Sequence, residues 1–185
     1  MLQRAAPLLA VLCSLSFGAS AAGKFSLKSS DVSAAKAIDN KFVFNSFGCS
    51  GENVSPALAW TGAPAGTKSF AITAYDPAAP TGSGWWHWVV FNIPASTTSL
   101  PSGAGDAKAP KLPDGAVQGN TDFGTPGYGG PCPPKGDKPH PYTFTVFALD
   151  TDKLDIPPGG TAAFVGFNLH GHTIDKASFT AKYGR

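Results

Sequence analysis

Short apolar runs rich in aromatic and β-branched residues recur along this chain in place of long amphipathic repeats. The strongest of them predict β-strands at residues 70–75, 86–93 and 142–149. The run at 86–93 is apolar over most of its length, which is typical of a strand buried on both faces. Weaker patterns predict three further short strands, at residues 24–28, 41–44 and 57–60.

Later positions follow a helical period instead. Residues 162–169 and 174–183 are predicted to form helices, the second with Thr173 as its N-cap. Residues 95–118 are rich in Gly, Pro, Ser and Ala, so they predict a long excursion with little regular structure. Many short strands followed by a helical tail predict a mostly-β fold, in which two β-sheets pack face to face with one or two short C-terminal α-helices.

Residues 1–22 have the layout of a secretory signal peptide. Arg4 gives a positive start, residues 5–17 form an apolar stretch, and residues 19–22 offer the small side chains that a signal peptidase requires. The apolar stretch is too short to span a bilayer, and no later run is long and apolar enough to do so. We therefore expect a single domain at residues 23–185, in the periplasm or secreted, and not an integral membrane protein.

The charges argue against one class of partner. Without Arg4, the 14 Lys and Arg residues become 13, against 12 Asp and Glu residues. These charges are scattered and form no basic stripe, so nucleic acid is not an expected partner.

Export would leave two cysteines, Cys49 and Cys132. In an oxidising compartment, two thiols in turn-rich segments favour a disulfide between them. A structural zinc site is the other common use of cysteine, but neither residue has a second thiol at ligand spacing. The predicted disulfide would hold the turn at residues 48–50 against the proline-rich segment 131–134.

Two stretches contain the side chains that could carry chemistry. In the first, Asp76 ends a predicted strand and is followed by prolines, while His87 lies among tryptophans on the next strand. Strand alternation predicts that His87 points away from Trp86 and Trp88. Ordinary structural roles compete here, because Asp76 can cap a turn and His87 can be a hydrogen-bonded core residue.

The second stretch comes some fifty residues later, with residues 130–136 followed by His140 and Tyr142. Proline fixes φ and removes a backbone donor, so such segments form rigid turns. Rigid turns at strand ends commonly hold binding sites. We expect the two stretches to form the walls of one pocket, although His140 could also be an ordinary surface residue.

Three kinds of site are compatible with one carboxylate, two imidazoles and one phenol. Two His and one Asp can bind non-haem iron or zinc, but the close spacing that puts two ligands on one element is absent, so no metal is expected. A hydrolase needs a nucleophile, and no Gly-x-Ser-x-Gly elbow occurs. The third kind is an anion pocket, in which protonated imidazole and phenol donate hydrogen bonds to a phosphate or carboxylate.

The same residues belong to a set of motifs found together in one known family. The motifs are Asp76-Pro77-x-Ala79-Pro80, Trp85-x-His87, Gly130-Pro131-Cys132-Pro133-Pro134-x-Gly136, His140-x-Tyr142, Asn53-x-Ser55-Pro56-x-Leu58-x-Trp60, Tyr128-Gly129-Gly130 and Gly171-His172. In kind and order the chain resembles the phosphatidylethanolamine-binding proteins, also called Raf kinase inhibitor proteins. The resemblance looks closest to the bacterial YbhB/YbcL-like branch and covers nearly all of the chain after the signal.

The resemblance implies a two-sheet β-fold with C-terminal helices and a small pocket for anionic groups, with no metal or other cofactor needed. It places the ligand-binding residues at Asp76, Pro80, Trp85, His87, Pro134, His140 and Tyr142. Eukaryotic members bind lipid headgroups and kinases, so the resemblance also leaves a protein target open.

Three positions depart from the usual family pattern. The family reads Asp-Pro-Asp-x-Pro and His-Arg-Tyr, whereas this chain has Ala78 for the second Asp and Pro141 for the Arg. An acidic and a basic residue are lost together, which fits a pair that normally meets beside the pocket. Thr121 replaces an Asn. We expect these changes to alter the pocket rim and not the fold.

The sequence thus predicts an exported binding protein for a phosphate, phospholipid headgroup or carboxylate, without catalysis. Because Asp76 would face the anion, we expect His87 or His140 to be protonated in the complex, or Asp76 to take up a proton. Phosphate affinity should then fall as the pH rises from about 5 to 8. Two alternatives are an interaction module that inhibits a protease or another enzyme, and a weak hydrolase using His87 and Asp76 with water. A homodimer is also compatible with the sequence.

Overall fold

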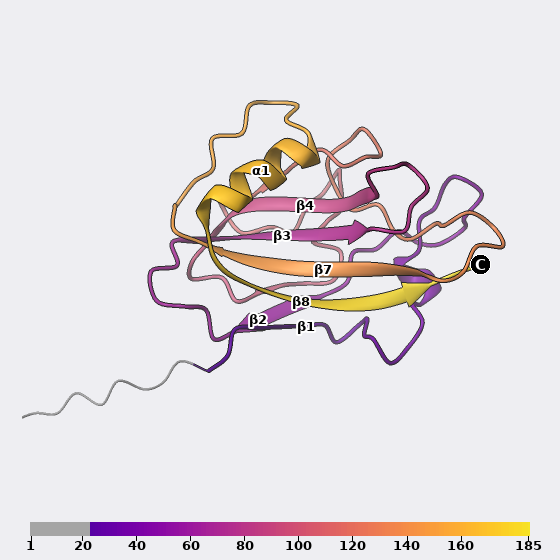
Figure 1. Ribbon diagram of the computed structural model, residues 1–185, viewed down its shortest axis with the longest axis horizontal. Coiled ribbons are helices and arrows are strands. Elements are labelled where there is room, and N and C mark those ends of the chain that lie inside the picture. The colour runs from indigo at the N-terminus through magenta and orange to yellow at the C-terminus, as the bar shows by residue number, and fades with distance from the viewer. Residues whose placement is uncertain (1–22) are drawn as a thin grey trace, which may run out of the picture.

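The strand pattern becomes two antiparallel sheets in the computed structural model, which describes residues 23–185 (Figure 1). The predicted signal peptide lies outside the described residues. The larger sheet has the strand order β6-β4-β3-β7-β8. Its strands are β3 (Ser69–Asp76), β4 (Trp85–Pro94), β6 (Val117–Gln118), β7 (His140–Leu149) and β8 (Thr173–Tyr183). The smaller sheet has the order β1-β2-β5, from β1 (Ser26–Lys28), β2 (Leu58–Thr61) and β5 (Ser99–Leu100).

Two apolar clusters lie on opposite faces of the larger sheet. The first, which we call the intersheet core, packs both sheets together and includes Trp60, Phe70, Ile72, Trp88, Val90 and Phe144. The second, the helix-side core, joins the larger sheet to α1 (Ala162–His172) and includes Ala71, Val89, Phe91, Val165 and Leu169. Figure 1 shows α1 lying across one face of the larger sheet and β1 and β2 on the other side. The predicted mostly-β, two-sheet fold is confirmed, with one α-helix among residues 23–185.

Most of the predicted elements are present. The strands expected at 70–75, 86–93 and 142–149 correspond to β3, β4 and β7, and the helix expected at 162–169 corresponds to α1. The excursion at 95–118 contains only the two-residue strands β5 and β6.

The helix predicted at 174–183 is wrong, because this segment is the edge strand β8. Ala177, Phe179 and Ala181 alternate toward the intersheet core, and Phe179 stacks on Phe144 of β7 with ring centroids 5.3 Å apart. Because Ala177 and Ala181 are small and lie four positions apart, the same apolar positions also fit the spacing of a helix. Thr173 ends α1 instead of beginning a helix, and its hydroxyl donates to the carbonyl oxygen of Leu169.

The strand predicted at 41–44 is also wrong. Asn40–Phe42 forms a single 3-10 turn, and the side chain of Asp39 caps it by accepting from the backbone N–H of Lys41. Local capping satisfies the backbone here, so Phe42 and Val43 are buried without joining a sheet.

Candidate functional site

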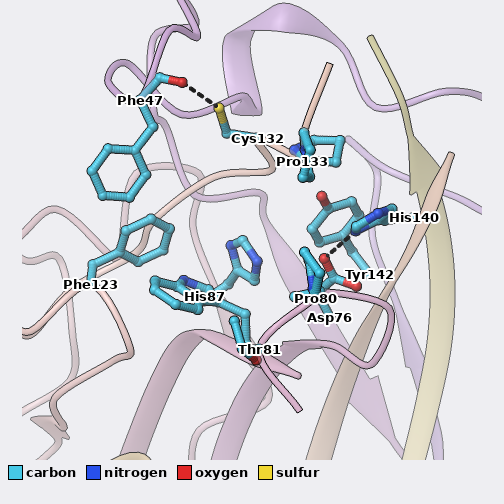
Figure 2. A pocket seen from close by; sticks show the side chains of 13 residues that line it. Phe47, Asp76, Pro80, Thr81, His87, Phe123, Cys132, Pro133, His140 and Tyr142 are labelled. Atoms are coloured by element: carbon cyan, nitrogen blue, oxygen red, sulfur yellow. Dashed lines mark hydrogen bonds and ion pairs between the residues drawn. The ribbon is translucent and has the colours of Figure 1, made fainter. Parts of the chain in front are cut away.

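A cavity of about 180 Å³ opens at one end of the larger sheet, where three strands meet (Figure 2). β3 ends with Asp76, β4 begins with Trp85, and β7 begins with His140. β3 pairs antiparallel with both neighbours, so its last residue lies beside the first residues of the other two. The fold therefore brings together residues that are far apart in the sequence.

All seven residues predicted for the pocket line this cavity: Asp76, Pro80, Trp85, His87, Pro134, His140 and Tyr142. The lining also contains Phe47, Thr81 and Phe123, which no local sequence pattern marks. The one signal that could have indicated Phe47 is its closeness in sequence to Cys49, whose predicted disulfide leads to the same wall.

Asp76 and His140 form a buried pair in the lining of the cavity. The Nδ1 of His140 lies 2.7 Å from Oδ2 of Asp76, and the two residues are 5% and 2% exposed. The other carboxylate oxygen of Asp76 accepts from the backbone N–H of Ala78 at 2.8 Å. On the outer side, Oδ2 of the half-exposed Asp137 lies 3.5 Å from Nε2 of His140. When Asp76 is ionised its carboxylate can only accept, so in that state Nδ1 of His140 donates to it.

His87 is the extra residue of a β-bulge. Ala74 of β3 pairs with Trp88 and Tyr75 pairs with Trp86, so His87 has no partner across the ladder. The bulge turns Trp86 toward the helix-side core while Trp88 enters the intersheet core. The expectation that His87 points away from both tryptophans is therefore wrong, because simple alternation fails at a bulge. Bulges are common beside functional sites, where they redirect a side chain.

The imidazole of His87 is held by the backbone of residues 129 and 130, and Gly129 makes the close contact. Its Nδ1 lies 2.7 Å from the carbonyl oxygen of Gly129. Burial lowers its pKa from 6.5 to about 4, although the Gly129 carbonyl and the charge of Asp76 act in the opposite direction. His87 is consequently a neutral imidazole near pH 7, and its Nδ1 donates to the carbonyl.

Tyr142 presents its hydroxyl group to the cavity. The residue is 1% exposed, and within residues 23–185 its hydroxyl has no hydrogen-bond partner. Burial raises the pKa of the phenol and the negative charge of Asp76 raises it further, while the backbone of Cys132 close to the oxygen lowers it, so the hydroxyl keeps its proton and that proton has no acceptor among the described residues. A buried polar group without a partner is unusual and points to a missing partner such as a ligand or water.

Aromatic rings form the wall opposite this polar group. Figure 2 shows Phe47 and Phe123 on the side away from Tyr142 and the Asp76–His140 pair. The ring of Phe123 contacts Trp85, with centroids 5.4 Å apart, and Phe47, with centroids 5.8 Å apart. Phe47 is 65% exposed, which is unusual for so large an apolar side chain.

A disulfide and an arginine hold the lip of the cavity, by which we mean residues 47–49 and the facing residues 131–134. Cys49 and Cys132 are joined, as the sequence predicts, with their Cα atoms 6.0 Å apart. The guanidinium of Arg185 donates through Nη1 to the carbonyl oxygen of Gly48 and through Nε to that of Pro133, both at 2.8 Å. The turn that contains Phe47 is therefore tied to the proline-rich wall by a covalent bond and by hydrogen bonds.

The residues that depart from the family pattern lie outside the lining. Neither Ala78, Pro141 nor Thr121 contributes to the cavity wall. Within residues 23–185, no three His, Cys, Asp or Glu side chains are grouped so that they could hold a metal ion. In the same part of the chain, no helix has the length and apolar character needed to cross a membrane.

Comparison with known proteins places these features in one family. The profile described as phosphatidylethanolamine-binding protein matches residues 28–184. YbcL of Escherichia coli is 51% identical over 173 residues, which is 94% of each chain. YbhB of the same organism is 52% identical over 157 residues, covering 85% of this chain and 98% of YbhB.

Solved structures agree with the sequence matches. The crystal structure of Escherichia coli YbcL, described as a member of the mammalian PEBP family, superposes with a TM-score of 0.86 at 51% identity, covering 88% of this chain and 99% of the other. A putative phosphatidylethanolamine-binding protein homologue from Chlamydia trachomatis superposes with a TM-score of 0.72 at 30% identity, covering 87% and 97%. The chain therefore belongs to the phosphatidylethanolamine-binding protein family.

Proposed function

We propose that this chain is an exported binding protein whose cavity takes a small anionic group, either a phosphate, a phospholipid headgroup or a carboxylate, and that it catalyses no reaction. Family membership supports the general role, since the family is described by its binding of a phospholipid. The disulfide between Cys49 and Cys132 supports export, because disulfides persist in oxidising compartments.

The observation that carries the proposal is the hydroxyl group of Tyr142. It is buried and protonated, its O–H has no acceptor in the described chain, and it lines a cavity large enough for a phosphate-sized group. An anion placed there would accept this hydrogen bond and remove the cost of leaving the donor unsatisfied. Charge-assisted hydrogen bonds of this kind are the stronger ones.

The absence of a reactive hydroxyl in the described lining supports a binding role. Thr81 is the lining residue with an aliphatic hydroxyl, and that hydroxyl donates to the carbonyl oxygen of Gly84. The hydroxyl proton is therefore held by a backbone carbonyl and not by a base, as an acyl-transfer or hydrolytic nucleophile would require.

The charge of the lining limits which anions fit. Among the described residues no Lys or Arg lines the cavity, and Asp76 brings a carboxylate. Burial disfavours the imidazolium form of His87, so the positive charge or proton that offsets Asp76 resides on His140, on Asp76 itself or on the ligand. The proton of a singly ionised phosphate is lost as the pH rises, so phosphate affinity should fall as the pH rises from about 5 to 8.

Calorimetric titration with inorganic phosphate and with phosphoethanolamine tests the proposal. Tyr142→Phe should weaken binding by about tenfold or more, because it removes the donor and leaves the cavity shape. Tyr183→Phe is the matched control, since Tyr183 does not line the cavity. If neither compound binds the unaltered protein at pH 5.5, or if both variants bind equally well, the proposed function is wrong.

A further inference from the structure

Asn53 clamps the segment that holds His87, although it lies outside the cavity lining. Its amide Nδ2 donates to the carbonyl oxygen of Tyr128 at 3.0 Å, and its Oδ1 accepts from the backbone N–H of Gly130 at 2.7 Å. Asn53 has a φ of 55°, a left-handed conformation that Asn tolerates better than most residues. One side chain therefore fixes the two residues on either side of Gly129.

Gly129 in turn is bonded to His87 at two points. Its backbone N–H donates to the carbonyl oxygen of His87 at 2.8 Å, and its own carbonyl oxygen lies 2.7 Å from Nδ1 of the ring. A Cβ atom at position 129 would overlap the ring of Phe123, so the segment must pass the site as glycine. The clamp from Asn53 thus determines where the carbonyl of Gly129 meets the imidazole.

This contact determines which ring nitrogen is available to a ligand. A neutral imidazole has one N–H and one bare nitrogen, and a carbonyl oxygen bonds only to the N–H. With Nδ1 donating to Gly129, Nε2 is the bare nitrogen of a residue that lines the cavity. The charges of Asp76 and Asp122 favour the imidazolium, but burial outweighs them and the ring stays neutral near pH 7.

We propose that Asn53 is a positioning residue that fixes the tautomer of His87, so that the ligand of the cavity must donate a hydrogen bond to Nε2. The requirement that the ligand donate to Nε2 rests on the proposed function, whereas the role of Asn53 in fixing the tautomer concerns the ligand-free protein alone.

The requirement for a donor selects among anions. A singly ionised phosphate or phosphate monoester keeps a P–OH group that donates to Nε2, while its other oxygens accept from Tyr142. Loss of the second proton, which in a phosphate monoester has a pKa of about 6, removes that donor and adds a charge beside Asp76. Sulfate has the same shape but carries no proton near neutral pH, so it offers His87 no hydrogen bond.

The tautomer is tested by NMR of the ring nitrogens in the ligand-free protein, because a bare and a protonated nitrogen differ widely in ¹⁵N shift. We expect a bare Nε2 and a protonated Nδ1 for His87 near pH 7. Asn53→Gly removes both clamp bonds and tolerates the positive φ, so a substantial Nε2–H population should appear. Asn40→Ala is the control, because it removes a hydrogen bond to the carbonyl oxygen of Ser50, three positions before Asn53, and should leave the tautomer unchanged.

Anion selectivity is tested by calorimetry with phosphate and sulfate at pH 5.5. Phosphate should bind about tenfold or more tightly than sulfate, and Asn53→Gly should reduce this ratio. A protonated Nε2 in the unaltered protein, or equal binding of sulfate, would overturn the inference. If phosphate does not bind at all, the proposed function and the ligand requirement both fail, whereas the NMR result still decides the role of Asn53.

Discussion

Removing the disulfide should lower the free energy of unfolding, because the unfolded chain gains conformational entropy when the loop is opened. The length of the loop gives the size of the effect. Cys49 and Cys132 are separated by 83 positions. The chain-entropy relation gives an entropy loss of about 15 cal/mol/K for closing such a loop, or about 4.5 kcal/mol at 25 °C. Because domains are typically stable by about 5–15 kcal/mol, the bond accounts for a large share of the total.

The assay is urea unfolding of the double variant Cys49→Ser/Cys132→Ser beside the oxidised protein. With an m value of about 2 kcal/mol/M, a loss of 4.5 kcal/mol lowers the unfolding midpoint by roughly 2 M. The native lip keeps other bonds, since Phe44 donates to the carbonyl oxygen of Pro131 and Arg185 still contacts Pro133. The loss should therefore come from the unfolded state and not from a collapsed lip.

Adding Arg185→Ala separates the two causes. If the disulfide acts on the unfolded chain, its removal costs the same free energy with and without the arginine, and the two effects add. A loss below about 1 kcal/mol in the double cysteine variant would contradict the loop-entropy reasoning. A strongly non-additive result with Arg185→Ala would show that the bond acts on the native lip instead.

Three further changes have outcomes that follow from the site. Asp76→Ala leaves the buried N–H of His140 without its acceptor and should lower the free energy of unfolding by about 2–3 kcal/mol, measured in urea. Gly129→Ala forces its methyl group into the ring of Phe123 and should cost about 1–3 kcal/mol. The pKa of His87 is lowered from 6.5 to about 4, so the unfolded chain binds an extra proton between these values. Stability should therefore fall by about 3 kcal/mol as the pH drops from 6.5 to 4.

Each of these changes has a matched control. Asp137→Ala removes the half-exposed carboxylate near His140 and should change stability by less than about 1 kcal/mol, as exposed pairs do. Gly171→Ala adds a methyl group to α1 where nothing lies within 4 Å, so it should be neutral or stabilising. Replacing His87 by Gln should flatten the stability profile between pH 6.5 and 4. An unchanged profile in that variant would assign the proton uptake to another group.

Most of the fold could be predicted from the sequence, because strands such as β3 and β7 are short runs rich in aromatic and β-branched residues. It failed at β8, where two alanines and one phenylalanine over residues 174–183 leave the period ambiguous, and only pairing with the full length of β7 selects a strand. It also failed at residues 41–44, where a cap from Asp39 decides the backbone. In both places a contact outside the segment decides between conformations that the segment alone permits.

The pocket residues could be named from the sequence, whereas their roles could not. Asp76, His140 and Tyr142 lie where strand ends predict them, yet the sequence does not say that His140 bonds to Asp76 or that the hydroxyl of Tyr142 is left without a partner. The orientation of His87 was beyond reach, because it depends on a bulge that interrupts strand alternation. Phe47 was missed because only the disulfide and Arg185 bring its turn to the cavity.

The chemistry of this site is therefore determined at a distance from the residues that line it. The carbonyl group that sets the His87 tautomer belongs to Gly129, and the side chain that places this carbonyl belongs to Asn53, 34 positions before the histidine in the chain. A related chain that keeps Trp-x-His but lacks an amide at the position of Asn53 would retain the cavity and lose the constraint on the imidazole. Phosphate and sulfate should then bind such a chain with similar affinity, because either ring nitrogen could carry the proton.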